Sequence, residues 1–248
     1  MIRLAQIVRH PIKSVGFEEL ASASLTKGRA LPFDREWAVI HEAAKFAELT
    51  SWQPKMNFLR GVAGPELMAI QARLDEAEET VTLTHPRAGE IKLSPDHDGQ
   101  RLIDWLRPLW STDRPAPARV GRVPGQPMSD TPSPFVALLN HSSNRALGQH
   151  LGQDLSIHRW RGNLWLDCMS PWEEFDLVGK SVRIGEAVLE VQERITRCKA
   201  TTVNPKTGRA DADTLGALEQ HYGHQDFGVY ALVTKSGNIA QGDEVTIL

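Results

Sequence analysis

Cysteine is scarce in this sequence: its 248 residues include only two, Cys168 and Cys198. Two cysteines cannot build a disulfide framework, and such scarcity is typical of proteins from a reducing compartment. No apolar run approaches the roughly 20 residues that a membrane-spanning helix needs. The alternating segment from Met1 to Ser14 lacks the continuous apolar stretch of a signal peptide. We therefore expect a cytoplasmic protein that does not cross a membrane.

An excess of charge of either sign is also missing. The net charge is −3 at pH 7, with 28 lysines and arginines against 31 aspartates and glutamates. This balance provides no general electrostatic basis for binding nucleic acid, and we expect no nucleic-acid partner. With 41% hydrophobic residues, the chain is long enough for one large domain or two small ones, each with a proper core.

The common nucleotide-binding and hydrolase motifs are absent as well. Residues 179–181 (GKS) resemble the end of a phosphate loop, but Glu174 replaces the glycine that such a loop needs five residues earlier. Neither a G-x-G-x-x-G nor a G-x-S-x-G segment occurs. His221 and His224 have no third ligand nearby in the sequence, so we interpret them as a surface pair and not as a zinc site.

Short apolar segments that alternate with polar residues dominate the pattern. Residues 68–74 and 80–85 flank an acidic stretch and predict a hairpin with Val81 and Leu83 on one face. Helical spacing and capping residues occur at three places, of which Asp98 and Gly152 are the clearest caps. We expect helices over 98–110, 142–150 and 213–222, and strands over 3–8, 20–25, 36–41, 58–62, 156–166, 181–184, 187–195, 228–234 and 244–248.

Many short strands with few helices predict a mainly β (α+β) fold of barrel type, and not an alternating βαβ sheet. The segment 114–134 contains six prolines and is the best candidate for a linker or structured loop. The sequence thus predicts a first domain over residues 1–113, which includes the helix near 98–110, and a second domain over residues 114–248.

The chemically richest stretch is residues 196–208 (TRCKATTVNPKTG), where a strand ends in a polar turn. Cys198 lies between Arg197 and Lys199, and two neighbouring cations favour the thiolate over the thiol. A thiolate is both a nucleophile and a soft metal ligand. The alternative is a small buried strand residue, against which the charged and hydroxylated neighbours argue. Cys168 follows the apolar run 164–167 and is expected to pack in the core.

Further polar clusters lie at expected strand ends, at residues 10–14 (HPIKS), 34–36 (DRE) and 159–163 (RWRGN). Arginine and lysine with hydroxyl neighbours suit an anionic ligand that is held by charge-assisted hydrogen bonds. Taken singly, each cluster is more often a solvated surface. The loop 129–133 (SDTPS) adds hydroxyls, with a plain Asx-type turn as the alternative.

In this order, the segments resemble the motifs of the MOSC superfamily, in particular the branch that contains the mitochondrial amidoxime-reducing component. The chain departs from the family pattern at three places: Pro132 is inserted between Thr131 and Ser133, Gly162 replaces a common proline, and Trp52 stands where arginine is frequent. Either hydroxyl beside Pro132 can therefore take the family role. The matching segments are HPIKS at 10–14, DREW at 34–37, SDTPSPF at 129–135, RGN at 161–163, RCKATTVNPKTG at 197–208 and FGVY at 227–230.

The resemblance implies an N-terminal β-barrel domain and a MOSC domain with a molybdenum–molybdopterin cofactor between them. It implies that Cys198 is the catalytic residue and the protein's thiolate ligand to molybdenum, and it gives no reason to expect pyridoxal phosphate in this chain. The cofactor-binding residues implied by matching motifs are Lys13, Ser14, Arg35, Asp130, Thr131, Ser133, Arg161, Asn163, Thr196, Arg197 and Tyr230.

The resemblance further implies an oxidoreductase whose small-molecule substrates are N-hydroxylated compounds, such as amidoximes and hydroxylamines. No flavin, haem or iron–sulfur motif is visible, so electrons are expected from a separate ferredoxin- or cytochrome b5-type protein with its reductase. An alternative is a cofactor carrier or sulfur-handling protein in which Cys198 carries a persulfide. A β-barrel binding module without chemistry is the third interpretation.

Overall fold

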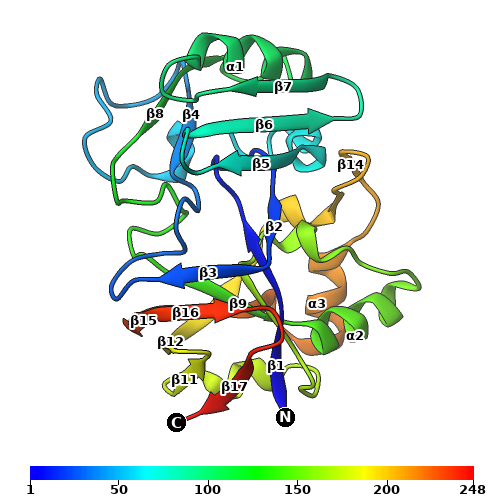
Figure 1. Ribbon diagram of the computed structural model, residues 1–248. Coiled ribbons are helices and arrows are strands. Elements are labelled where there is room, and N and C mark those ends of the chain that lie inside the picture. The colour runs from blue at the N-terminus through cyan, green and yellow to red at the C-terminus, as the bar shows by residue number, and fades with distance from the viewer.

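A closed β barrel forms the lower of two stacked lobes in the computed structural model, which describes residues 1–248 (Figure 1). Its seven strands follow the order β10-β9-β15-β12-β11-β17-β1, and pairing of β1 with β10 closes the barrel. Strand β2 (Glu18–Leu20) extends the sheet beside β1. The barrel strands are β1 (Ile2–Arg9), β9 (Val136–Asn140), β10 (Leu164–Asp167), β11 (Ser181–Ile184), β12 (Ala187–Thr196), β15 (Asp226–Lys235) and β17 (Glu244–Ile247).

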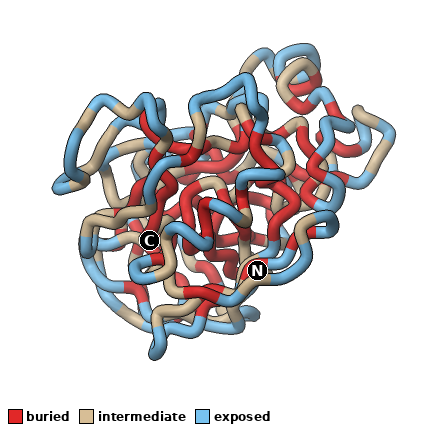
Figure 2. The backbone as a smooth tube through the Cα atoms, turned by 90° about the horizontal axis from the view of Figure 1, so that it is seen from above, coloured by how far each residue is buried: buried red, intermediate tan, exposed pale blue.

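Alternating side chains explain how these strands close around a core. In β12, Leu189 and Val191 are buried in the barrel core, and Glu190 between them is exposed. Two helices, α2 (His141–Leu151) and α3 (Thr214–Tyr222), pack outside the barrel against a second buried cluster. Figure 2 shows the buried segments in the interior and the exposed ones around them.

Helix ends follow the local sequence in this lobe. The Asn140 side chain accepts a hydrogen bond from the Ser142 backbone and begins α2, and Gly152 ends it in the left-handed conformation. Asp213 Oδ1 accepts from the Gly216 backbone at 3.0 Å and begins α3. The predictions for these two helices are therefore confirmed.

The upper lobe holds two small sheets and one helix (Figure 1). Its core is the predicted face of Val81 and Leu83, covered by Leu102 and Leu106 of the helix. The hairpin of β5 with β6 is the predicted one, although it begins three residues later. The elements are β4 (Trp37–His41) paired with β8 (Pro117–Arg122), β5 (Gln71–Asp75), β6 (Thr80–His85), β7 (Gly89–Leu93) and α1 (Gly99–Leu106).

Shorter elements join the two lobes and shape the space between them. Two-residue strands form a small hairpin, and one pair of outer strands lies beside the barrel. These strands are β13 (Val203–Asn204) with β14 (Arg209–Ala210), and β3 (Ser22–Leu25) with β16 (Gly237–Ala240); the 3₁₀ helices are η1 (Lys55–Asn57), η2 (Pro65–Ala69), η3 (Arg107–Leu109), η4 (Ile157–Trp160), η5 (Glu173–Leu177) and η6 (Lys199–Thr202).

The mainly β fold class is confirmed, but several expected strands are wrong. Residues 58–62 make only one bridge, from Phe58 to Ile40; residues 59 and 60 have no regular structure, and residues 61 and 62 lie in a turn. The expected strand over 156–166 begins only at Leu164, because Ser156 caps η4 and Arg161 takes a positive φ of 50°. The proline-rich segment 114–134 contains strand β8, which pairs with β4.

The start of the chain belongs to the barrel lobe, because β1 and β2 lie in the same sheet as the strands after residue 136. The division between residues 113 and 114 stays a prediction. No helix has the length and apolar character needed to cross a membrane.

Cys168 corrects one expectation about the core. Cys168 is exposed, whereas the sequence pattern predicted that it packs in the core. Strand β10 ends at Asp167, and Cys168 follows in the left-handed conformation with φ 63°. The apolar run before it is buried, but the chain turns outward one residue earlier than the pattern predicts.

Candidate functional site

One cleft between the lobes gathers residues that are far apart in the sequence. Eleven of the twelve predicted site residues line it, and Ser133 does not. At this loop Thr131 lines the cleft, and its Oγ1 donates to the Ser133 carbonyl at 3.5 Å. The eleven residues are Lys13, Ser14, Arg35, Asp130, Thr131, Arg161, Asn163, Thr196, Arg197, Cys198 and Tyr230.

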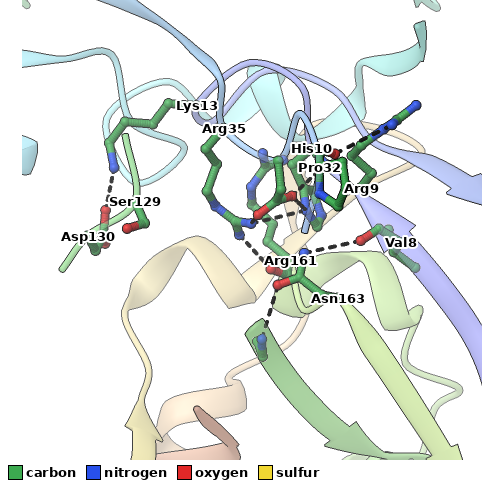
Figure 3. Close-up of polar contacts among 12 residues, drawn as sticks. Val8, Arg9, His10, Lys13, Pro32, Arg35, Ser129, Asp130, Arg161 and Asn163 are labelled. Atoms are coloured by element: carbon green, nitrogen blue, oxygen red, sulfur yellow. Dashed lines mark hydrogen bonds and ion pairs between the residues drawn. The ribbon is translucent and has the colours of Figure 1, made fainter. Parts of the chain in front are cut away.

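Lys13 enters the cleft from the turn that follows β1. Its backbone nitrogen donates to Trp37 O at 2.7 Å, which fixes the turn against β4. The Lys13 ammonium donates to Asp130 Oδ1 at 2.6 Å (Figure 3), and Lys55 lies 3.4 Å from the other carboxylate oxygen. The Asp130 carboxylate thus lies between two cations.

Arg35 and Arg161 meet near the centre of this view (Figure 3). Arg35 pairs with the Asp34 carboxylate, and its Nη2 donates to the Arg161 carbonyl at 2.7 Å. Arg161 Nη1 donates to Gly16 O at 3.1 Å. The other terminal nitrogen, Arg161 Nη2, is buried and has no hydrogen-bond partner. Because an unsatisfied buried donor is costly, this nitrogen is a position at which an anionic ligand would be stabilised.

Three of the cleft residues have a backbone conformation that side chains disfavour. Ser14, Arg35 and Arg161 have φ angles of 62°, 55° and 50°, in the left-handed region. Each such residue costs about 1–3 kcal/mol, and such strain is concentrated at ligand-binding sites in proteins. The surrounding contacts therefore hold these three residues against their local preference.

The cations of the cleft are poorly solvated. Burial lowers the pKa of Lys13 to about 8, although Asp130 acts in the opposite direction. Burial and the neighbouring Arg35 lower the pKa of Arg161 to about 9. Burial likewise lowers the pKa of Arg197 to about 10. Added negative charge in the cleft would reverse these shifts.

Two carboxylates balance part of this positive charge. Burial is the largest influence on the pKa of Asp130 and raises it, but the charge and hydrogen bond of Lys13, together with the charges of Lys55 and Arg35, outweigh burial, and the pKa falls to about 2. For Asp34, burial is likewise outweighed, here by Arg35 and by hydrogen bonds from His10, so its pKa lies well below the usual value. His10 is itself held neutral, because burial and the two arginines lower its pKa. Seven lysine and arginine side chains therefore line the cleft, against the two carboxylates of Asp34 and Asp130.

Cys198 lies at the end of β12, directly before η6. The cysteine is free and exposed, and it lines the same cleft as the cations. Its carbonyl accepts from Thr201 N and Thr201 Oγ1, both at 3.1 Å. The neighbouring Arg197 donates through Nε to Phe227 O and through Nη1 to Trp160 O, each at 2.8 Å. These bonds fix the backbone on both sides of the thiol.

The remaining predicted residues play different parts. The Tyr230 ring stacks on Phe135 with ring centroids 4.9 Å apart. Thr196 Oγ1 donates to Asp226 at 2.6 Å. The buried Asn163 amide donates to Val8 O at 3.2 Å and accepts from the Ala137 backbone at 3.1 Å, so it joins β1 to β9 (Figure 3).

Four charged residues of the cleft were missed by the motif-based list: Asp34, Lys55, Arg60 and Arg159. Asp34 and Arg159 belong to polar clusters in the sequence, so adjacency to Arg35 and Arg161 was the available signal. Lys55 is the first residue of η1 and Arg60 lies in irregular chain, and neither belongs to a recognisable motif, so only the fold brings them to the cleft.

Two domain families match parts of this chain. Residues 1–105 match the MOSC N-terminal beta barrel domain, and residues 128–246 match the MOSC domain. A molybdenum cofactor sulfurase from Drosophila grimshawi is 24% identical over 99% of this chain and 34% of that protein. One from Caenorhabditis briggsae is 31% identical over 89% of this chain and 32% of that protein. The chain thus spans about a third of the length of these relatives.

Among solved structures, the YUAD protein from Bacillus subtilis aligns with a TM-score of 0.48 and 12% identity, over 100% of this chain and 96% of that one. YiiM from Geobacillus stearothermophilus aligns with a TM-score of 0.35 and 16% identity, over 46% of this chain and 53% of that one. The two matched domains cover the barrel and the cleft that faces it. The chain therefore belongs to the MOSC-domain proteins that also carry a MOSC N-terminal beta barrel domain.

Proposed function

We propose that the cleft binds a molybdenum–molybdopterin cofactor with Cys198 as the thiolate ligand to the metal. In this proposal the chain is an oxidoreductase that reduces N-hydroxylated compounds such as amidoximes and hydroxylamines. One observation carries the proposal: the exposed Cys198 lines the same cleft as Arg161, whose buried Nη2 has no partner. A soft metal ligand and an unsatisfied anion donor thus face one space.

The donor set fits such a group. No cluster of three or more His, Cys, Asp or Glu side chains in the chain could hold a metal ion. A metal at Cys198 must therefore arrive with its own donor atoms, as the sulfur atoms of a pterin dithiolene would supply. The pterin phosphate needs cations, and the cleft has more cations than carboxylates.

The residues divide by position in the cleft. Arg161 Nη2 and the Lys13 ammonium would hold the phosphate. Arg35 donates a hydrogen bond to the Arg161 carbonyl and so helps to hold the Arg161 backbone in place. The Cys198 sulfur would bind molybdenum, and Tyr230 with Thr131 would add hydrogen bonds to the pterin. When bound, the cofactor supplies two-electron redox chemistry and oxygen-atom transfer. The chain binds and orients it and shields one side of it from water.

Substrate and electrons have to reach Cys198 from outside. The cysteine is exposed, so a small substrate has access to that end of the cleft. We propose a separate ferredoxin- or cytochrome b5-type donor with its reductase as the source of electrons, and the cytoplasm as the location.

A second candidate function is cofactor carriage or sulfur handling. It is favoured by the similarity to molybdenum cofactor sulfurases, which extends over nearly the whole chain. In this alternative, Cys198 carries a persulfide in the cleft and binds no metal. An exposed, free cysteine beside the cations satisfies the steric requirement of either function.

The experiment that separates the two starts from protein made in a host that synthesises the pterin cofactor. Molybdenum is measured by elemental analysis, and benzamidoxime reduction is measured with an artificial electron donor. Stoichiometric molybdenum with reductase activity supports the proposed enzyme. Sulfane sulfur on Cys198 without molybdenum supports the sulfur-handling protein, and absence of both would refute the two proposals together.

A further inference from the structure

Arg159 is a buried charge whose bonds all lead to one segment of the chain. Its side chain is 1% exposed, although it carries a full positive charge. Nη1 donates to Thr201 O at 3.1 Å and to Val203 O at 3.2 Å, and Nη2 donates to Asp211 Oδ1 at 2.9 Å. Burying a guanidinium is costly unless such bonds compensate for it, and here both terminal nitrogens are bonded within residues 201–211, whereas the buried Nε has no partner.

That segment begins with the turn of Cys198. Thr201, whose carbonyl Arg159 holds, donates through its own hydroxyl and backbone nitrogen to the Cys198 carbonyl. Asp211 closes the other end, because its second carboxylate oxygen accepts from the Asn204 amide at 2.7 Å. Arg159 therefore forms hydrogen bonds near both ends of the loop 201–211 that follows Cys198.

Arg159 is also close in the chain to Arg161, whose unpartnered nitrogen is the proposed anion-binding donor. Arg159 lies two positions before Arg161, and the Arg161 backbone nitrogen donates to His158 O at 3.3 Å within the same turn. We propose that Arg159 is a positioning residue that sets the place of the Cys198 sulfur relative to Arg161. Arg159 acts through the backbone and through Asp211, and not by contact with the reacting atoms.

The importance of Cys198 itself rests on the proposed function, but the coupling can be measured without any cofactor. Changing Cys168 to Ser leaves Cys198 as the only thiol. In this background, the rate of Cys198 modification is measured with an anionic reagent, 5,5′-dithiobis(2-nitrobenzoate), and with neutral methyl methanethiosulfonate. The ratio of the two rate constants reports whether the sulfur faces the cations of the cleft.

Arg159→Met should lower this ratio by roughly fivefold, because the change removes one cation that lines the cleft and displaces the sulfur from the others, so the anionic reagent is attracted less. The control is Arg145→Met, which removes an exposed arginine of α2 that pairs with Asp167 and leaves the loop intact. A ratio that stays unchanged in folded Arg159→Met protein would overturn the proposal.

Asp211→Ala separates positioning from simple charge. This change removes the bonds to Arg159 and Asn204 and also removes a negative charge near the loop. Charge alone predicts a higher ratio, whereas loss of positioning predicts a lower one. If Arg159→Met does not fold, Asp211→Ala provides the test. A lower ratio of the anionic to the neutral rate constant supports the proposal, and an equal or higher ratio refutes it. Because no cofactor takes part, the result is independent of whether molybdenum binds.

Discussion

At the scale of single residues, the cleft depends on groups that the protein leaves unsatisfied. Arg161 Nη2 is buried without a partner, and Lys13 keeps a charge that burial disfavours. Most buried polar groups in proteins are hydrogen-bonded, so the unpartnered Arg161 nitrogen calls for a physical explanation. An anionic ligand provides one, because it would satisfy the Arg161 donor and stabilise the charge of Lys13.

Arg161→Met tests this explanation directly. Removing a charge-assisted hydrogen bond should weaken cofactor binding by about 10- to 100-fold, which corresponds to the typical 1.5–3 kcal/mol of such a bond. The measurement is the molybdenum content after dialysis, compared with Arg119→Met, an exposed arginine whose partner is Phe46 O in the upper lobe. Equal retention of molybdenum in both variants would remove Arg161 from the binding site.

Cys198→Ala and Cys168→Ala form a matched pair, because both cysteines are free and exposed. Only Cys198 lines the cleft. We expect the first change to abolish benzamidoxime reduction and the second to leave turnover close to that of the unmodified protein. Circular dichroism should show both variants folded. Loss of turnover in Cys168→Ala would mean that the wrong cysteine has been assigned.

At the scale of elements, glycine controls how closely β15 approaches its neighbours. Gly228 has φ +77°, and a Cβ added there would lie 2.8 Å from the Leu138 carbonyl oxygen of β9. The preceding Phe227 provides the carbonyl that holds Arg197. A larger residue at this position would therefore disturb both the strand pairing and the cleft.

Gly228→Ala should destabilise the protein by about 1–3 kcal/mol from the strained backbone, with a further loss from the contact with β9. Gly179→Ala is the control, since Gly179 has φ +82° but nothing lies within 4 Å of its added Cβ. Urea unfolding of the two variants measures the difference. Similar losses of unfolding free energy in both variants would show that the close contact with the Leu138 carbonyl does not account for the destabilisation.

The helices and strands also show which parts of the secondary structure the sequence patterns could predict. The hairpin of β5 and β6 and helices α2 and α3 were predicted, because their signals are periodicity and caps within a few residues. The strand expected over 156–166 failed, because the 3₁₀ turn of η4 depends on bonds to distant segments. Residues 58–62 failed in the same way, since a strand needs a long partner and the fold provides only one bridge there.

At the scale of the whole molecule, the two lobes bring like charges together across the cleft. Lys13 and Arg35 approach Arg161 and Arg197, which lie on the barrel side. The lowered pKa values show that folding is opposed by these charges in the ligand-free protein. An anionic ligand should therefore strengthen the association of the lobes as well as fill the cleft.

The pH dependence of stability tests this balance. The pKa of Lys13 is lowered from its model-compound value of 10.5 to about 8 in the folded chain, so the unfolded chain binds more protons between these values. The penalty is full below pH 8 and disappears as the pH rises toward 10.5. The Tm of the unmodified ligand-free protein, measured relative to that of Lys13→Met, should therefore rise as the pH increases from 8 toward 10.5.

Lys92→Met provides the reference for this experiment, because Lys92 is an exposed residue of β7 away from the cleft. Its Tm difference from the unmodified protein should not follow the same trend. If the Lys13→Met difference stays constant from pH 7 to pH 9.5, the buried charge of Lys13 is not a source of instability.

The sequence by itself determined the chemical groups: a cysteine between two cations, clusters of basic and hydroxyl residues, and alternating strands that favour a β fold. Only the tertiary structure decided which of these groups meet, because segments 10–14, 34–37, 129–135, 161–163 and 196–198 become neighbours through long-range pairing. It also decided that Cys168 is exposed, that Arg161 keeps a free donor and that Arg159 holds the Cys198 loop. Burial and hydrogen-bond partners depend on the packing of distant segments, and local residue patterns do not contain that information.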